Sequence, residues 1–376
     1  MISIDLKAEL NGLTNALSAR VEIGEVASVL SSLNFSETSV VLPESALVFY
    51  RKEIAIRNEQ KESPSLVTVT NKGELNGSLE KNAVVIGNQT FINQITLNEN
   101  FKGVNFYLVP TSPQIEGLML KNATLLILDE KLIAKSAQTE VALAFLNVMA
   151  KPLALIDYKI NSYLSGKNAK SKWFNEVKRA VSIASKLTEY SNYKSAVLCA
   201  QAILMVVSNL SSVLAPSGEE CVFSALKLCL TETSALSLKF TAIEKTAKLY
   251  HLFFSNDFSA LLSAPDYASD VKLLSELTGN NANEYLIALK SPSNQRLKLV
   301  YMLIEKTRAD FILETGAFLK ALNGIKKVYL AITKQKGDLA VYTTGVKNAV
   351  TVAPYLSQCE NVLTLLRDMG VLKCIN

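Results

Sequence analysis

The chain has 376 residues, of which 49% are hydrophobic and 19% charged, and its formal net charge at pH 7 is +5. This composition is typical of a globular protein with a large core and excludes an intrinsically disordered chain. The small positive charge comes without a basic block carrying interleaved aromatic residues, so we expect no nucleic-acid partner. The length exceeds what one core comfortably supports, which favours two domains.

The N-terminus and the cysteines indicate a soluble protein in a reducing compartment. The first residues, MISIDLKAEL, contain an early acid and lack the apolar region of a signal peptide. The longest nearly apolar stretch, 196–207, is interrupted by Gln201 and is too short to cross a bilayer. The five cysteines are odd in number and have no C-x-x-C spacing. We therefore expect a cytoplasmic protein with reduced, mostly buried cysteines and no membrane partner.

The first half of the chain alternates between strand and helix patterns. Apolar, β-branched runs predict strands at the start of 20–33 and at 39–42, 66–70, 83–86, 106–109 and 124–128. A helix is expected in the rest of 20–33 and a loop at 71–77. This alternation predicts a Rossmann-like α/β domain with a parallel sheet and helices on both faces. Ligands of such sheets bind beyond the carboxyl ends of the strands, so Gly87, 110–112 and Asp129 should share one rim.

The second half of the chain reads as helical. From about Val141 the apolar period changes to 3.6 residues. Prolines, Pro152 among them, are expected to break or start helices. Helices are predicted at 192–212, 217–230, 235–254, 268–278, 281–290, 294–321 and 356–369. We expect an α/β nucleotide-binding-like domain at 1–160 and an all-helical domain at 161–376, with a cleft between them as the ligand site.

Several motifs occur in the order and spacing of one enzyme superfamily. GNQTFINQIT at 87–96 stands where that superfamily has GGGTVIDVAK, and VPTSPQIEG at 109–117 matches its VPT-S-x-x-x-D-G motif. AFLNVMAK and ALIDYKI follow at 144–160, and SGEECVFSALKL lies at 217–228. Over roughly residues 20–290 the chain resembles the dehydroquinate synthases and the iron-containing alcohol and glycerol dehydrogenases. The nearest subgroup is the sn-glycerol-1-phosphate dehydrogenase-like proteins.

The resemblance also shows what is missing from a metal site. Members of the superfamily hold zinc or iron with one aspartate and two histidines. Asn147 stands at the aspartate position, Cys221 and Ala225 at the histidines of the next motif, and Thr231 where the third ligand motif falls. An amide is a weaker ligand than a carboxylate, and alanine is none, so we expect no zinc or iron.

The nucleotide turn is altered in a similar way. Three glycines would let backbone N–H groups approach a pyrophosphate, but here only Gly87 remains and Asn88 and Gln89 carry side chains. Thr111 and Ser112 still offer hydroxyl groups to a phosphate, although such a turn is also ordinary loop chemistry. These changes leave NAD or NADP open as a ligand but do not favour it.

The remaining ionisable residues have two interpretations each. The single histidine, His251, lies in KLYHLFF and reads as a helix-face residue rather than a metal ligand. Glu219 and Glu220 beside Cys221 read as solvated acids at a helix start rather than an ion site. Lys151 near the cleft reads as a surface lysine or as a phosphate contact. The sequence contains neither a G-x-S-x-G elbow nor a P-loop lysine motif.

The preferred interpretation is a degenerate glycerol-1-phosphate dehydrogenase-like protein, a pseudoenzyme that has lost metal-dependent catalysis and acts in binding or assembly. The alternative is a metal-independent, NAD(P)-dependent oxidoreductase of a phosphorylated polyol. It would need Lys151 in the electrostatic role of the metal. A third interpretation keeps the cleft for an unrelated small ligand. A small phosphorylated ligand fits the first two, and homodimers are common in the superfamily, so the resemblance leaves a homodimer open.

Overall fold

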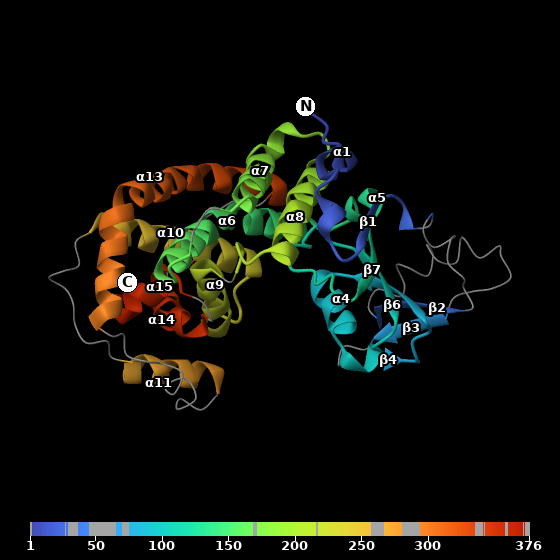
Figure 1. Cartoon of the computed structure of the whole chain (residues 1–376). Helices are drawn as coiled ribbons and strands as arrows, with labels where there is room; N and C mark the ends of the chain where they lie inside the picture. Colours follow the sequence, from blue (N-terminus) through green and yellow to red (C-terminus); the bar gives the residue numbers. More distant parts are fainter. Residues whose placement is uncertain are drawn as a thin grey trace. The chain divides into compact units, whose positions relative to one another are not determined.

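A computed structural model divides the chain into two compact units (Figure 1). The first unit comprises Met1–Ala144 and Ser182–Leu210, and the second comprises Phe145–Val181 and Ser211–Asn376. The structure describes residues 2–26, 28, 37–44, 65–69, 75–167, 171–215, 217–256, 267–279, 294–334, 341, 343–357, 360–370 and 372. The helices predicted after Gly24 and at 281–290 fall largely or wholly outside these ranges, as do Cys359 and Cys374.

The first unit contains a seven-stranded sheet with the strand order β1-β7-β6-β5-β2-β3-β4 (Figure 1). Neighbouring strands are parallel except for the pair β3 and β4, which is antiparallel. The strands are β1 (Arg20–Ile23), β2 (Thr38–Pro43), β3 (Ser65–Val69), β4 (Leu75–Asn76), β5 (Asn82–Gly87), β6 (Asn105–Pro110) and β7 (Ala123–Leu128). The predicted parallel, Rossmann-like sheet is confirmed, whereas the short edge strand β4 lies where a loop was predicted.

The core of this unit covers both faces of the sheet. Successive side chains of a strand point to opposite faces, and in β5 both Val84 and Val85 are fully buried. Buried residues of β2, β5, β6 and β7 form one continuous cluster, with Val84 and Ile86 at its centre. A sheet buried on both faces needs near-continuous apolar strands, which is why these strands read as apolar runs instead of alternating patterns.

The carboxyl ends of three neighbouring strands meet at one rim, as predicted. Gly87 at the end of β5 is in register with Pro110 at the end of β6. The next strand, β7, ends one residue before Asp129, whose side chain accepts hydrogen bonds from the N–H groups of Lys131, Leu132 and Val26. Asp129 therefore serves as the cap of a helix, and its acceptor oxygens are engaged within the fold.

Helices of the first unit pack against the sheet and against one another. They are α1 (Leu6–Leu10), α4 (Gln89–Thr96), α5 (Glu130–Ile133) and α8 (Tyr193–Leu210), with short 3₁₀ turns at Thr14–Ala16, Glu99–Phe101 and Leu187–Glu189. α4 contacts β5 and β6, and α8 contacts α1 and α5. The fully buried Gln201 of α8 accepts from the N–H groups of Ile115 and Glu116 and donates to the carbonyl of Ala144.

Two helices run from one unit into the other. They are α6 (Gln138–Leu164) and α7 (Trp173–Ser185), and α6 continues through Pro152 without ending. The expectation that Pro152 breaks a helix is wrong. The proline ring removes only one backbone donor, and the rest of the helix stays packed. The observed division also differs from a single boundary at 160/161: α6 changes unit after Ala144, and residues 182–210 return to the first unit.

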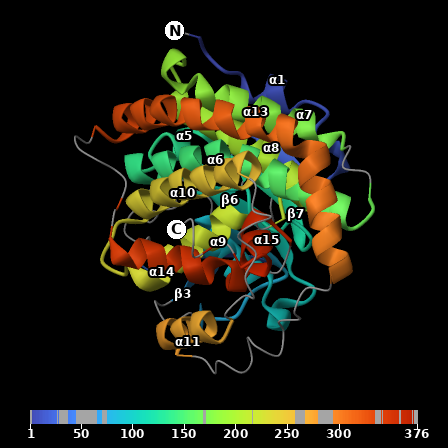
Figure 2. The same cartoon turned by 90° about the vertical axis from the view of Figure 1, so that its left-hand side faces the viewer.

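The described residues of the second unit form helices joined by turns, without a strand (Figure 2). Besides its parts of α6 and α7, it contains α9 (Gly218–Cys229), α10 (Ala235–Ser255), α11 (Tyr267–Thr278), α13 (Asn294–Thr333), α14 (Thr344–Val352) and α15 (Val362–Asp368). α9 contacts α10, α14 and α15, and α10 contacts α13. The predicted all-helical domain is confirmed in kind, but α13 is longer than predicted, α15 is shorter, and α14 was not predicted.

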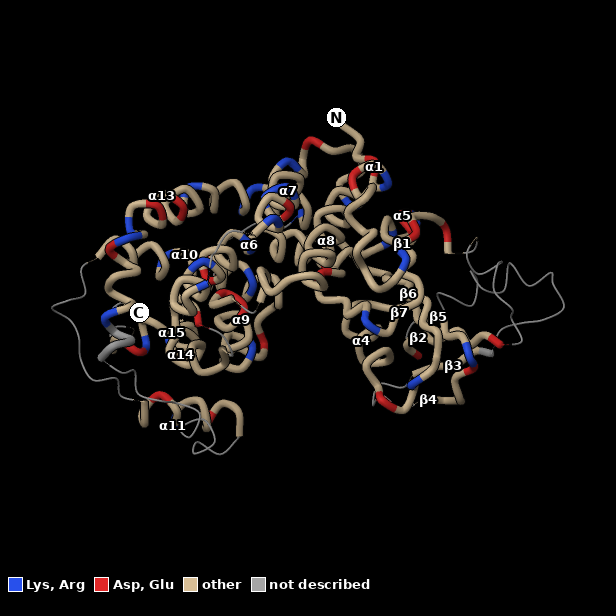
Figure 3. Tube along the Cα trace, viewed as in Figure 1, with Lys and Arg blue, Asp and Glu red and all other residues tan. Residues whose placement is uncertain are grey.

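Among the helices that the structure describes, two, α6 and α8, are long and apolar enough to cross a membrane by length and composition. The sequence analysis considered only the stretch 196–207, which is too short to cross a bilayer, whereas the helix that contains it, α8, extends from Tyr193 to Leu210. In the most apolar windows of α6 and α8, 72% and 67% of the residues are buried, as in core helices of a soluble protein. Lys and Arg are interspersed with Asp and Glu over the described chain (Figure 3).

Candidate functional site

The turn after β5 is built by short contacts between neighbouring residues. Asn88 caps α4, since its side chain accepts a hydrogen bond from the N–H of Phe91 at 3.0 Å. A Cβ on Gly87 would lie 2.5 Å from the Phe91 ring, so any larger residue here would have to displace that ring. Asn88 has an extended backbone, with φ of −76°, and the left-handed conformation considered for it is not used. The capping side chain thus engages one of the N–H groups of the helix start.

Two side chains of α4, those of Gln89 and Asn93, contact the loop after β6. Gln89 covers Gly117 so closely that a Cβ there would lie 2.2 Å from the side-chain nitrogen of Gln89. Asn93 donates to the carbonyl of Gly117 at 2.8 Å and accepts from the N–H of Met119 at 3.0 Å. The two residues that replace a glycine and an acid of the superfamily motif therefore bind the neighbouring loop.

The hydroxyl-bearing turn after β6 is likewise engaged within the protein. Thr111 donates its N–H to the carbonyl of Gly87, and its own carbonyl accepts from Ser136. Ser112 is buried, and its hydroxyl oxygen accepts from the N–H of Gln114 at 3.3 Å. Gly87, Asn88, Gln89, Thr111 and Ser112 thus lie together at one rim. The Asn88 side chain takes the N–H of Phe91 and the Gln89 side chain fills the space beside Gly117, so the start of α4 fits a pyrophosphate poorly, although the hydroxyls of Thr111 and Ser112 keep their donor protons.

In the second unit, the start of α9 is surrounded by buried polar groups. Asp157 of α6 accepts three hydrogen bonds: from the N–H of Gly218 at 2.9 Å, from the Tyr250 hydroxyl at 2.5 Å and from the N–H of Val362 at 3.1 Å. These partners begin α9, lie on α10 and begin α15. One carboxyl group therefore joins four helices and satisfies the free N–H groups at two helix starts.

Burial decides the protonation of this cluster. It raises the pKa of Asp157 from 3.8 to about 7, with Glu220 adding to the rise and the three hydrogen bonds opposing it. Burial and the neighbouring Asp157 also raise the pKa of Tyr250 well above its ordinary value, so the phenol stays protonated and donates. Near pH 7 the Asp157 carboxyl is therefore partly protonated.

Two ion pairs lie on the same helix start. The Lys151 ammonium is 3.0 Å from a Glu220 oxygen, and the Lys239 ammonium is 3.0 Å from a Glu219 oxygen. Both lysine side chains are 4% exposed and that of Glu219 is 1% exposed. The readings of Lys151 as a surface lysine and of Glu219 as a solvated acid are therefore wrong.

The charge of these groups follows from their partners. Burial raises the pKa of Glu219, against the effect of Lys239, and its second oxygen has no hydrogen-bond partner within the described chain. Burial acts on Glu220 in the same direction, but Lys151 and Lys239 outweigh it and lower the pKa of Glu220. Two lysines and two glutamates thus balance each other in formal charge.

The residues that the sequence motifs align with the superfamily's metal ligands do not form a ligand set in the structure. Asn147 is half-buried on α6, Ala225 is buried on α9, and Thr231 is exposed beyond the end of α9. Burial, together with the neighbouring Asp157, Glu220 and Glu219, raises the pKa of the Cys221 thiol to about 12, so at neutral pH the thiolate that binds metals is scarce. No group of three His, Cys, Asp or Glu residues able to hold a metal occurs in the described part of the chain. The residues present do not fit zinc or iron.

His251 lies on α10 and is half-buried, as expected for a helix-face residue. Its Nδ1 atom is 3.0 Å from the Thr315 hydroxyl of α13. The contact joins two packed helices of the second unit and requires no metal.

Sequence reasoning missed three members of the polar cluster: Asp157, Lys239 and Tyr250. A signal for Asp157 was present, since it is a lone acid within the apolar run LALID of a helix core. Such an acid is either solvated or satisfied by buried donors. Its donors come from residues 61 to 205 positions away, and the sequence does not show which ones they are.

Comparison with known proteins agrees on the fold. No protein-family model matches the sequence, and no curated protein matches it. The iron-containing alcohol dehydrogenase of Corynebacterium glutamicum superposes with a TM-score of 0.52 at 13% identity, covering 95% of this chain and 96% of that one. The substrate- and cofactor-free aldehyde reductase YqhD of E. coli gives 0.53 at 8% identity, covering 95% and 98%.

The chain therefore has the fold of the iron-containing alcohol dehydrogenases. At these identities the likeness concerns the fold alone, and the two-domain plan implied by the sequence motifs is confirmed at that level. The particular closeness to glycerol-1-phosphate dehydrogenase-like proteins stays a prediction.

Proposed function

We propose that this protein keeps the dehydrogenase fold without metal-dependent catalysis and acts as a binding or assembly protein. The observation that carries this proposal is the two ion pairs on α9, Lys151–Glu220 and Lys239–Glu219, of which the second is buried on both sides and the first on the lysine side. They lie beside Cys221, the residue aligned with a metal-binding histidine. A divalent cation placed there would meet two ammonium groups whose charges are already balanced, together with a protonated thiol.

The alternative, a metal-independent NAD(P)-dependent oxidoreductase of a phosphorylated polyol, has less support. It needs Lys151 to act on a substrate, yet the Lys151 ammonium is buried against Glu220. It also needs the turn after β5 to bind a cofactor, yet the Asn88 side chain already accepts from the N–H of Phe91 at the start of α4. The cytoplasmic location, the homodimer and a small phosphorylated ligand between the domains remain predictions.

Calorimetric titration of the full-length, EDTA-treated protein tests the proposal directly. We expect no saturable heat with NADH or NADPH, and none with Zn²⁺ or Fe²⁺ (the iron arm under anaerobic conditions), from protein shown to be folded by circular dichroism. Micromolar binding of a nicotinamide nucleotide, or one metal ion bound per chain, would overturn it. Dehydrogenase assays on polyol phosphates would then be the next measurement.

A variant with the glycines restored separates the two parts of the proposal. Asn88→Gly combined with Gln89→Gly removes the side chains that fill the turn after Gly87, while α4 keeps its contacts with β5 and β6. Nucleotide binding by this variant but not by the natural chain would show that those side chains exclude the cofactor.

A further inference from the structure

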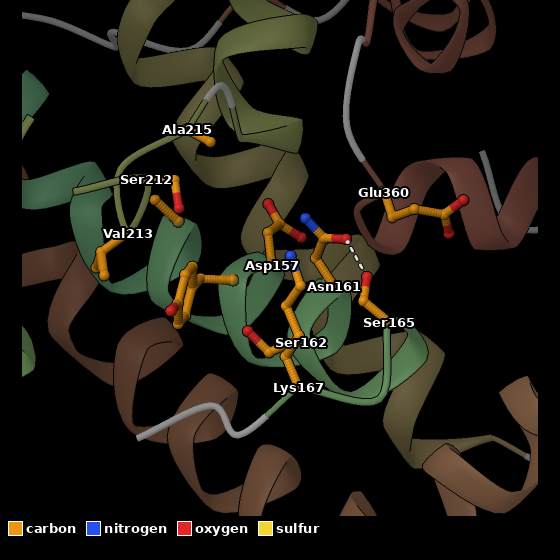
Figure 4. A pocket seen from close by; sticks show the side chains of 11 residues that line it. Asp157, Asn161, Ser162, Ser165, Lys167, Ser212, Val213, Ala215 and Glu360 are labelled. Carbon is orange, nitrogen blue, oxygen red and sulfur yellow. Dashed lines mark hydrogen bonds between the residues drawn. The ribbon is translucent and has the colours of Figure 1, made fainter. Parts of the chain in front are cut away.

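The second unit contains a polar pocket on the face of α6 that carries Asp157 (Figure 4). Its volume is about 160 Å³, well above the ~10–15 Å³ that a single water requires. It is lined by Ala154, Asp157, Tyr158, Asn161, Ser162, Ser165, Lys167, Ser212, Val213, Ala215 and Glu360. None of these residues is among those aligned with the metal or nucleotide motifs of the superfamily.

The pocket is rich in hydrogen-bond donors that the protein itself does not use. The Asn161 side-chain oxygen accepts from Ser165 at 3.4 Å, which leaves the Asn161 NH₂ group as a donor. Within the described chain, neither this NH₂ group nor the Lys167 ammonium has a partner, and the same holds for the hydroxyls of Ser162 and Ser212. Figure 4 shows the Lys167 side chain extending toward the part of the pocket where Asn161 lies.

The two acids of the pocket do not offset these donors. Asp157 already accepts three hydrogen bonds, and burial raises its pKa to about 7, so much of its population is neutral at neutral pH. Figure 4 shows the Glu360 carboxylate turned away from Asn161 and Lys167. The inner surface therefore presents one ammonium, one amide NH₂ and two hydroxyl groups against little negative charge.

We propose that this pocket binds a small ligand through an oxyanion group held by Lys167 and Asn161, with Ser162 and Ser212 as further donors. Carboxylates and phosphates are the biological groups that accept several such hydrogen bonds, and an ammonium donor strengthens each of them. The pocket lies within one unit, so the proposal is independent of any site between the units and of whether dehydrogenase chemistry has been lost.

The test is a titration of the full-length protein at pH 6, where the Asp157 carboxyl is mainly protonated. Inorganic phosphate, ethyl phosphate and acetate are the probes, read by calorimetry and by the shift in thermal unfolding temperature. We expect saturable binding of at least one of them. Tighter binding of the phosphates assigns a phosphate monoester, and tighter binding of acetate assigns a carboxylate.

Two substitutions locate the site. Lys167→Ala removes a charged donor from an exposed side chain and should weaken binding about tenfold or more. Asn161→Asp keeps the shape but replaces the NH₂ donor by a carboxylate, so it should weaken binding at least as much once that carboxylate is ionised. The matched control is Lys178→Ala, which removes an exposed lysine from α7 of the same unit and should leave binding unchanged.

Three results would overturn the proposal. The first is the absence of saturable binding of every probe to the folded natural chain. The second is an equal loss of affinity in Lys167→Ala and Lys178→Ala, because that would indicate attraction by net charge alone. The third is unchanged or tighter binding in Asn161→Asp.

Discussion

Two glycines at the rim of the sheet are constrained in different ways. At Gly87 the space that a Cβ would occupy is filled by the aromatic ring of Phe91, whose position is set by its own helix. At Gly117 the same space is filled by the amide end of Gln89, the far end of a flexible side chain. The two positions therefore differ in what must move if a methyl group is added.

This difference predicts unequal effects of one substitution. Gly87→Ala should lower the free energy of unfolding by about 1–3 kcal/mol, because the added methyl overlaps the Phe91 ring. Gly117→Ala should change it by less than about 1 kcal/mol, since Gln89 can swing away. Urea unfolding of the two variants measures the contrast. Equal destabilisation would show that the Gln89 amide is held as firmly as the ring.

Contacts between elements concentrate on a few buried polar side chains. Gln201 joins α8 to α6 and to the loop after β6, while Lys239 of α10 holds Glu219 at the start of α9. Gln201 and Lys239 each place a long polar side chain among the mostly apolar buried residues of their helix. Such a group stabilises one arrangement of the helices because any other arrangement leaves it unpaired.

Removal of Lys239 should expose the cost of an unpaired buried charge. Lys239→Met leaves Glu219 without its cation, and we expect a loss of about 3–5 kcal/mol in unfolding free energy. Adding Glu219→Leu to this variant should recover much of the loss. Lys248→Ala, which breaks the more exposed pair with Glu244 on α10, is the control and should cost no more than about 1 kcal/mol. A small effect of Lys239→Met would contradict the burial of this pair.

Gln201 gives a second test between elements, in the first unit. Gln201→Leu retains a similar volume but removes the acceptor that the N–H groups of Ile115 and Glu116 share and the donor to the carbonyl of Ala144. The loss should be about 1–3 kcal/mol for each group that finds no water. Urea unfolding of Gln201→Leu and of the natural chain measures this loss, and equal stabilities would contradict the buried contacts of Gln201.

On the scale of the whole molecule, Asp157 links stability to pH. Its pKa is about 7 in the folded chain against 3.8 without the fold, so between these values the folded state binds more protons than the unfolded state. The stabilising contribution is complete below pH 4 and is lost as the pH rises to about 7, by at most ~1.4 kcal/mol per pH unit. This is the opposite of the usual behaviour of a salt-bridged aspartate.

The pH profile of unfolding tests this linkage. Asp157→Asn should be less stable overall, because the asparagine NH₂ group cannot accept the hydrogen bond that one carboxylate oxygen accepts. Its free energy of unfolding should not show the decrease between pH 5 and 7 that the titration of Asp157 causes in the natural chain. Burial also raises the pKa values of Glu140 and Glu219, so these residues make the free energy of unfolding fall with pH in both proteins. The difference between the two pH profiles therefore isolates the contribution of Asp157. Parallel profiles for the two proteins would contradict a raised pKa.

The sequence by itself determined the classes of structure in this chain. Apolar runs bounded by turn residues predicted the strands, because a sheet buried on both faces requires such runs, and the 3.6-residue period predicted the helices. The ordered motifs around Gly87, Thr111 and Cys221 pointed to the fold that the structural comparison supports. The same motifs predict that Asn147 and Ala225 stand where the superfamily has metal ligands, since the identity of a side chain is a local property of the chain.

Only the tertiary structure decided which charges are buried and paired. Lys151 and Glu219 read as solvated groups because their helices are amphipathic in part, and burial depends on neighbours far along the chain. Asp157 gained its role from donors at Gly218, Tyr250 and Val362, which meet only when α9, α10 and α15 pack on α6. The pocket beside it arises in the same way. Local sequence patterns set the elements, but long-range packing sets the dielectric environment and the partners of each polar group.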